Sequence, residues 1–537
     1  MANLSSPTQR LISQYQDWYQ SLSPKQGVVK IKVDEVTSKV ATFYEKIRQI
    51  VDWQEQHLMR RIAIERILKR RLFLRKNGDN NIAEVFIFEL IRGGYFPNDF
   101  IKETKVPQIQ KILDKYTFIL DQAPKLPKNK TQSEFYSQIM GIAACEIEET
   151  LDPSFYLKEN ALIEYMEVFM NERIRVGKRA LKLTNISENE KNIQIYIAIQ
   201  QALFKLDLPI ISYNLIKRQY SFWSDFSQSL FQKIAQNIHS ILNQIEKSLA
   251  HPLSSKFYKV CESYDTIYLL LGDILTKNPM EIKEEINQPE VLEKLIDQAY
   301  THRLKTLKSR LSRAAFYSTL SIFLTNIFVL YVFEFPFAKY VMGDINVLAA
   351  FVDVAAPTFL MFLLVVTIKP PPKKNRELVL NEVKKVVYEN QDKYLYEVEI
   401  FTKRRLIFRI INKLMYFVSF CGCFGLILWS LYTLNYPPLS YILLITFISL
   451  IAFAGTKIRQ RSKELHIIEE KDGLFQVIID LFSIPVIRVG KWFSTHWRKI
   501  NIINVIFNIL IDTPFLIFLE FLEQWRYFLK EKKEDIR

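Results

Sequence analysis

Four long apolar stretches lie in the second half of the chain and constrain its fold more than any other feature. Residues 314–333 carry no charge over twenty positions, and similar runs occupy 347–368, 414–434 and 437–456. A helix rises 1.5 Å per residue, so each run reaches about 30 Å, the thickness of a bilayer's hydrocarbon core. A helix buried in a soluble domain is the alternative for any single run. Four runs together favour transmembrane helices.

Positive charge is distributed unevenly around these runs. The chain has 537 residues and a formal net charge of +15. Twelve Lys and Arg residues lie in 369–413, between the second and third runs, whereas the links 334–346 and 435–436 hold only Lys339. Short loops rich in Lys and Arg stay on the cytoplasmic side of a membrane. We therefore predict two transmembrane hairpins in the plasma membrane, with both chain ends and the segment 369–413 in the cytoplasm.

The C-terminal region 474–533 is apolar but is interrupted by polar residues at helical spacing. Four of them, spaced 3, 4 and 4 positions apart, fall on one helix face: Asn501, Asn504, Asn508 and Asp512. This pattern predicts amphipathic helices that lie in the inner membrane interface, the first of them ending at Pro485. Three tryptophans would anchor these helices at headgroup depth: Trp492, Trp497 and Trp525. The alternative is a re-entrant pair, or a fifth and a sixth span within a helical bundle.

Residues 1–300 show helical periodicity in one stretch after another and no alternating strand pattern. Helix breaks are expected at prolines, among them Pro153 and Pro209. The helix 289–312 is expected to continue into the first span. The linker 369–413 has apolar positions that need a partner, so we expect it to dock on the N-terminal helices.

The predicted fold class is all-α, with a helical cytoplasmic domain joined to a polytopic α-helical membrane domain. The predicted parts are a cytoplasmic domain (1–300), a first transmembrane hairpin (301–368), a basic helical linker (369–413), a second hairpin (414–456) and C-terminal membrane-surface helices (457–537).

A cluster of basic residues is the sharpest local feature of the N-terminal part. Its members are Arg60, Arg61, Arg66, Lys69, Arg70, Arg71, Arg75 and Lys76. Such a cluster can bind anionic lipid headgroups, and we assign it that candidate role. A solvated helix end, where the helix dipole favours cations, is the simplest alternative. A nucleic-acid site is a further alternative, although we do not expect nucleic acid among the partners.

Asp353 is the candidate functional residue within the apolar runs. It lies seven residues into the second run, four residues before Pro357. An ionisable group inside a membrane segment indicates an ion or proton pathway, although here it could also cap a broken helix or reach the outer interface. The pair Cys421 and Cys423 could bind a soft metal or carry an acyl chain. One intervening residue is poor spacing for zinc, so close helix packing through Gly422 and Gly425 is the better interpretation.

No sequence motif indicates catalysis. The six histidines are scattered, and no HExxH, GxxxxGK[ST], GxGxxG or GxSxG occurs. We therefore expect no cofactor and no metal, and we lean against an enzyme; a lipid-modifying enzyme at the inner leaflet is disfavoured for the same reason. The expected function is a membrane-anchored helical scaffold that presents a platform to a cytoplasmic protein partner, contacts anionic lipids and can form a homo-oligomer. The alternative is an oligomeric transport or channel protein with Asp353 in the pathway and the N-terminal domain as regulator.

Overall fold

The computed structural model divides the chain into two compact units. Unit 1 comprises Met1–Asn287, Val386–Glu399 and Phe507–Arg537, and unit 2 comprises Gln288–Lys385 and Ile400–Ile506. The structure describes residues 4–23, 29–33, 56–73, 82–126, 130–224, 228–337, 339–340, 347–366, 371–388, 396–398, 406–433, 438–462, 465, 474–500 and a few single positions after 517. The polar face predicted at Asn501–Asp512 lies outside the described residues.

Both units are almost entirely helical, which confirms the predicted all-α class. The sheet formed by the described residues is a parallel pair of three-residue strands, β1 (Ile174–Val176) and β2 (Tyr396–Val398). The two strands are more than 200 residues apart in sequence, so this pairing has no local sequence signature.

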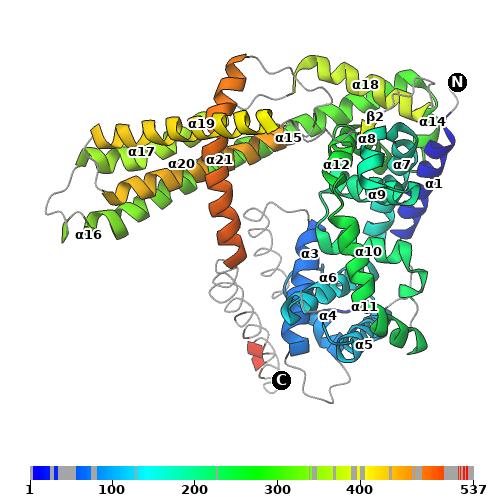
Figure 1. The fold of residues 1–537 in the computed structure, drawn as a ribbon. Coiled ribbons are helices and arrows are strands. Elements are labelled where there is room, and N and C mark those ends of the chain that lie inside the picture. Colours follow the sequence, from blue (N-terminus) through cyan, green and yellow to red (C-terminus); the bar gives the residue numbers. More distant parts are fainter. Residues whose placement is uncertain are drawn as a thin grey trace. The chain divides into compact units, whose positions relative to one another are not determined.

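Unit 1 is an assembly of short and medium-length helices (Figure 1). Its helices are α1 (Ser6–Ser21), α3 (Gln56–Phe73), α4 (Ile82–Arg92), α5 (Val106–Gln122), α6 (Gln132–Leu151), α7 (Pro153–Arg173), α8 (Lys178–Thr184), α9 (Glu188–Phe204), α10 (Leu208–Gln219), α11 (Gln228–Leu249), α12 (Ser254–Glu262), α13 (Asp265–Lys277) and α14 (Ile282–Ile286). An extensive apolar core joins α3, α4, α5, α6, α10 and α11. Burial of these apolar side chains is the main force that holds the unit together.

Several helix starts follow directly from the sequence. Thr131 and Glu134 form a capping box at the start of α6, because each side chain accepts a hydrogen bond from the other residue's backbone N–H. Pro153 opens α7 and Pro209 lies in the first turn of α10, where a missing N–H costs nothing. The two prolines predicted as breaks therefore mark helix starts.

A charged group is buried in the core of unit 1. The side chain of Lys115 is fully buried, and its Nζ donates to a carboxylate oxygen of Glu146 and to the carbonyl oxygen of Trp223 at 3.1 Å. The Tyr116 hydroxyl donates to Glu146 at 2.6 Å and accepts a hydrogen bond from Trp223 Nε1 at 3.2 Å. Burial lowers the pKa of Lys115, and the carboxylate of Glu146 opposes this effect. The buried charge is tolerated because it has an ionic partner and hydrogen bonds.

A second buried group makes the stability of unit 1 depend on pH. Glu148 is 1% exposed, and burial raises its pKa from 4.5 to about 8, although the charge of Arg60 acts in the opposite direction. Between pH 4.5 and about 8, the folded protein therefore holds a proton on Glu148 that the unfolded chain has lost. The free energy of unfolding therefore falls as the pH rises through this window, by at most about 1.4 kcal/mol per pH unit.

We expect the substitution Glu148→Gln to flatten this pH dependence, because the amide has no proton to lose. The measurement is the thermal unfolding midpoint of the detergent-purified protein at pH values from about 5 to about 8. Asp121→Asn, which changes an exposed carboxylate at the end of α5, is the matched control and should keep the wild-type slope. A Glu148→Gln protein with the wild-type slope would contradict the assignment.

Part of the linker docks on unit 1, as its apolar positions predicted. The carbonyl oxygen of Val387 accepts hydrogen bonds from the backbone N–H of Ser5 at 3.0 Å and from Thr8 Oγ1 at 3.3 Å. The hydroxyl of Tyr388 donates to the carbonyl oxygen of Ile286, and β2 pairs with β1. The described residues of Val386–Glu399 are thus structural members of unit 1.

Unit 2 consists of longer helices. They are α15 (Pro289–Val329), a π-helical turn (Leu330–Glu334), α16 (Phe335–Phe337), α17 (Val347–Val366), α18 (Lys373–Val387), α19 (Leu406–Thr433), α20 (Pro438–Ser462) and α21 (Leu474–Ile500). The helix predicted to run from 289 into the first span is present as the single 41-residue helix α15. α17 packs between α15 and α20.

Among the described residues of unit 2, three helices are long and apolar enough to cross a membrane. They are Pro289–Phe337, Ile410–Thr433 and Ser440–Gln460. In the most apolar 18-residue segment of each helix, only 6%, 17% and 22% of the segment, respectively, is buried within the protein. Exposed apolar surface of this extent is incompatible with water, so these helices associate with a membrane. The described part of the fourth predicted span, Phe351–Val366, is a shorter apolar helix. The predicted number of two hairpins is therefore not confirmed, and α19 packs mainly on α21 rather than on α20.

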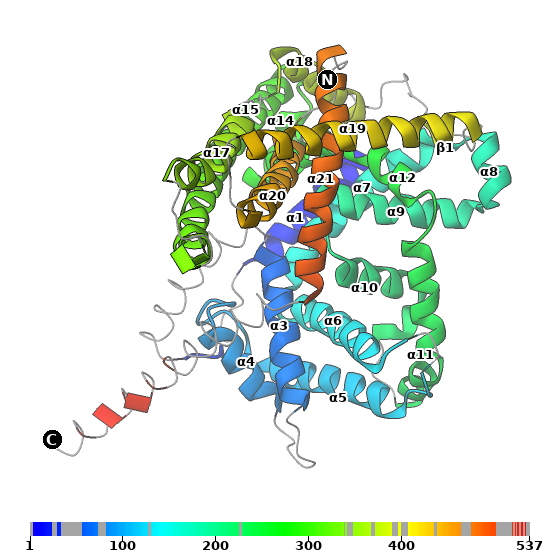
Figure 2. The same ribbon diagram turned by 60° about the vertical axis from the view of Figure 1, so that its left-hand side comes forward.

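The helix α21 differs from its prediction. It continues through Pro485, which was expected to end it, and runs to Ile500. Figures 1 and 2 show α21 crossing α19 and α20 steeply instead of running alongside them. The crossing is stabilised by a hydrogen bond from Ser419 Oγ to the carbonyl oxygen of Leu481 (2.6 Å) and by the Arg488 guanidinium over the Tyr416 ring (4.6 Å).

The first part of α15 is paired with α18. Asp297 and Glu293 of α15 form ion pairs with Arg376 and Lys384 of α18. The fully buried Asn375 donates a hydrogen bond to the hydroxyl of Tyr300 at 3.2 Å. These contacts fix the end of α15 that precedes its apolar part.

Candidate functional site

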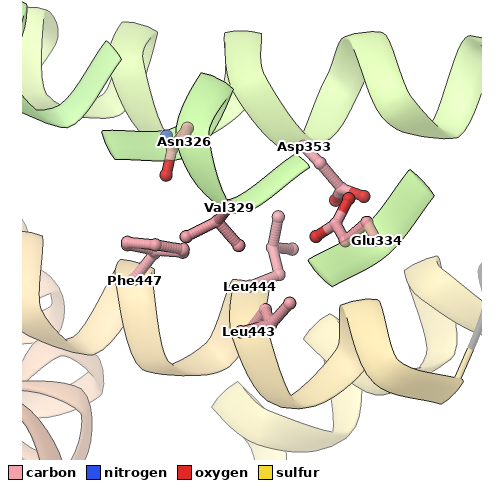
Figure 3. Close-up of a pocket in the computed structure, with 7 residues that line it drawn as sticks. All are labelled: Asn326, Val329, Glu334, Asp353, Leu443, Leu444 and Phe447. Atoms are coloured by element: carbon pink, nitrogen blue, oxygen red, sulfur yellow. The ribbon is translucent and has the colours of Figure 1, made fainter. Parts of the chain in front are cut away.

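The candidate site is a cavity between the helices of unit 2 that contains two carboxyl groups (Figure 3). Its lining comes from α15, the π-helical turn, α17 and α20: Asn326, Val329, Glu334, Asp353, Leu443, Leu444 and Phe447. The empty volume is about 210 Å³, including the part that is open to the surroundings. Polar groups thus meet between helices whose outer surfaces are apolar.

Asp353 faces the inside of this helix group. Its side chain is 8% exposed, whereas Phe351 on the same helix is 72% exposed. The apolar face of α17 is therefore directed outward and the aspartate inward.

Glu334 is the second carboxyl group of the site. It is the last residue of the π-helical turn that follows α15, and Figure 3 shows its carboxyl group directed at that of Asp353. A π-helical turn holds an additional residue, and such turns often occur at functional sites because they redirect side chains. Glu334 is the first residue of the predicted external link 334–346, so the sequence alone did not indicate it as a site residue.

Asn326 adds a buried amide to the cavity. It is 4% exposed, and neither its Nδ2 nor its Oδ1 makes a hydrogen bond with any described residue. The same holds for Oδ1 of Asp353. Leaving a buried polar group without a partner costs about 1–3 kcal/mol, so these atoms indicate a site that a bound ion or water would complete.

Ser440 completes the polar surroundings of Asp353. This residue is 2% exposed, lies in the first turn of α20 and is within hydrogen-bonding reach of the Asp353 carboxyl group. The N-terminus of a helix carries partial positive charge, which favours an anionic group nearby.

The arrangement is suited to binding a proton or a small hard cation. Two carboxylates that face each other in an apolar environment repel unless a proton or a cation lies between them. The oxygen donors available are two carboxyl groups, an amide and a hydroxyl, which suit hard cations.

The basic cluster predicted on the N-terminal part lies along α3, and several of its charges are already paired within unit 1. The pairs are Arg60 with Asp152 (2.8 Å), Arg61 with Asp207 (2.6 Å), Lys69 with Glu65 (2.6 Å) and Arg71 with Glu89 (2.8 Å). Arg70 also contacts Glu89, Arg66 is half-buried, and Arg75 and Lys76 lie outside the described residues. Lipid binding by this cluster stays a prediction. The charges of Arg60 and Arg61 are already paired with carboxylates of the same unit.

The predicted interfacial tryptophans are on the surface where they are described. Trp492 of α21 is 55% exposed and Trp525 is 51% exposed, while the side chain of Trp497 lies outside the described residues. Cys421 is exposed and Cys423 half-buried on α19, and Gly422 between them lies against Phe482 of α21. This contact agrees with the packing interpretation for Gly422, whereas a Cβ atom at Gly425 would meet nothing within 4 Å.

Within the described part of the chain, no group of three or more His, Cys, Asp or Glu residues is arranged to hold a metal ion. In comparisons with known proteins, no family model matches the chain, and no characterised protein or solved structure is similar to it.

Proposed function

We propose that this chain is a multi-pass protein of the plasma membrane that binds and transports protons or small cations through the cavity at Glu334 and Asp353. The observation that carries the proposal is the inward-facing pair of carboxyl groups next to the unpartnered amide of Asn326. Ionisable groups within membrane segments are costly, and they persist where they serve ion or proton movement.

The distribution of charge supports an orientation with both chain ends in the cytoplasm. On this topology α15 starts at the inner side, because Arg303, Lys305, Lys308 and further basic residues precede its apolar part. The carboxyl pair then lies toward the outer ends of α15 and α17. The candidate spans among the described residues of one chain are few for enclosing a pore, so the proposal includes a homo-oligomer. A reporter fused after Arg537 should be active only in the cytoplasm, and an external signal would refute this orientation.

Transport is tested directly with purified protein in sealed liposomes. We expect the wild-type protein to dissipate an imposed gradient of protons or of Na⁺, followed with a dye in the lumen. Asp353→Asn and Glu334→Gln should each lower the rate at least about tenfold, because either substitution removes one charge of the pair. Glu377→Gln, which changes an exposed carboxylate on α18 of the same unit, is the matched control and should keep the wild-type rate.

The second candidate function is a membrane-anchored scaffold that presents unit 1 to a cytoplasmic protein partner. The observation that favours it is that unit 1 is a large helical body with its own apolar core. The segment Val386–Glu399, which interrupts unit 2 in sequence, also belongs to unit 1. A scaffold requires no flux. Wild-type liposomes without proton or cation flux, together with normal assembly of Asp353→Asn, would refute transport and leave the scaffold.

A further inference from the structure

The short helix α8 of unit 1 has an unusual exposed face. Two leucines point to solvent on it, Leu181 with 42% and Leu183 with 66% of their surface exposed. Lys178, Arg179 and Lys182 are exposed on the same helix, and Ala180 is its buried contact with the unit. At 3.6 residues per turn, the five exposed side chains cover about 200° of the helix, with the cations between the two leucines.

The cations of this face are not neutralised by the fold. No ion pair joins Lys178, Arg179 or Lys182 to a described residue, whereas the α3 cluster has most of its charges paired. The segment 175–184 contains no acidic residue, and the nearest acids along the chain are Glu172 before it and Glu188 after it. The surface therefore offers net positive charge next to exposed apolar side chains.

The chain connects α8 closely to a candidate membrane span. Backbone N–H of Gly177, the residue before α8, donates to the carbonyl oxygen of Val398 at 3.0 Å, and β1 and β2 pair in register just before it. Only residues 399–405 separate β2 from α19. A fully extended linker of this length reaches at most about 27 Å. Along the chain, the strand that pairs next to α8 is therefore followed within eight residues by α19, which contains a candidate membrane span.

We propose that α8 is a membrane-contact surface that binds the anionic headgroups of the inner leaflet. Leu183, at one edge of this face, enters the headgroup region together with the aliphatic stems of Arg179 and Lys182, whose charged ends contact lipid phosphates. Leu181 lies at the opposite edge of the face and takes no part in this contact. Basic side chains next to a membrane are attracted to the negative surface potential of the cytoplasmic leaflet. The inference uses the membrane orientation given under the proposed function but not cation transport, so a failed flux assay would not affect it.

The test uses the full-length protein in vesicles, with a polarity-sensitive fluorophore on Leu183→Cys. Cys421→Ser and Cys423→Ser form the background, because the other two cysteines, Cys145 and Cys261, are buried. In vesicles of phosphatidylcholine with phosphatidylglycerol we expect a blue-shifted emission and at least about twofold quenching by headgroup-region nitroxide lipids. Vesicles of phosphatidylcholine alone should give neither effect.

Leu208→Cys is the matched control, because Leu208 is 59% exposed in unit 1 beside Asp207 and without adjacent cations in sequence. It should remain unquenched in both kinds of vesicle. Replacing Lys178, Arg179 and Lys182 by Glu should abolish the quenching at position 183 while the helical circular dichroism stays unchanged. A label at 183 that is unquenched in anionic vesicles, or quenched equally without anionic lipid, or quenched after the charge reversal, would overturn the proposal.

Discussion

Lys115→Met should be among the most destabilising single substitutions in unit 1, at a cost of about 3–5 kcal/mol. The substitution leaves the carboxylate of Glu146 buried next to the hydroxyl of Tyr116 without its ionic partner, and it removes a donor to the carbonyl oxygen of Trp223. For a body of this size the cost corresponds to a decrease of roughly 5–15 °C in the thermal unfolding midpoint. Trp223 is fully buried in the same network, so it contributes to the change in the fluorescence of the seven tryptophans on unfolding.

The same helix offers a control for this prediction. Lys111 lies one turn earlier on α5 and is exposed, so Lys111→Met should change stability by less than about 0.5 kcal/mol. Adding Glu146→Leu to Lys115→Met removes the orphaned carboxylate, and we expect it to restore part of the lost stability. Equal midpoints for Lys115→Met and Lys111→Met would show that the buried ion pair is not important for the fold.

Gly490→Ala should separate α21 from α20. At Gly490 a Cβ atom would overlap the backbone carbonyl of Ser449 and approach Cβ of Phe453 to 3.0 Å. A helix backbone cannot yield as a flexible side chain can, so one methyl group forces the crossing helices apart. Small residues permit such close contacts between membrane helices, and overpacking costs typically about 1–3 kcal/mol.

The measurement for Gly490 is the thermal midpoint of the detergent-purified protein, combined with the rate at which protease cuts the chain next to α21. We expect a lower midpoint and faster cleavage. Gly425→Ala on α19 is the control, because a Cβ at Gly425 meets nothing within 4 Å. If both alanine variants behave alike, the crossing seen in Figures 1 and 2 does not depend on close approach at Gly490.

The helical class and the apolar helices of unit 2 could be predicted because they depend on local patterns. Apolar runs and helical spacing are properties of neighbouring residues, and α15 and α20 lie where these patterns indicated. The helix α10 was not predicted, because Pro209 was taken as a break although it occupies the first helical turn. The continuation of α21 through Pro485 was not predicted either. A proline inside a long helix can be accommodated by packing against its neighbours.

The candidate site could be predicted only in part. Asp353 was identified because a charge in an apolar run is visible in the sequence. Its partner Glu334 was not, because the contact depends on the π-helical turn and on the packing of α17 against α15. Asn326 gave no signal, since an uncharged amide in an apolar run is unremarkable until its lack of hydrogen bonds is known. The strand pair β1 and β2 is likewise set by contacts between distant segments.

The unbroken length of α15 has a mechanical consequence. At 1.5 Å per residue its 41 residues form a rod of about 60 Å. One end is clamped to α18 through Asp297 and Glu293, and the other carries Asn326 and leads into Glu334. A stiff rod amplifies pivoting, and a swing of about 5° at the clamp displaces the far end by about 5 Å. That exceeds the length of a hydrogen bond, so a rigid swing of α15 with α17 held in place would separate the two acids.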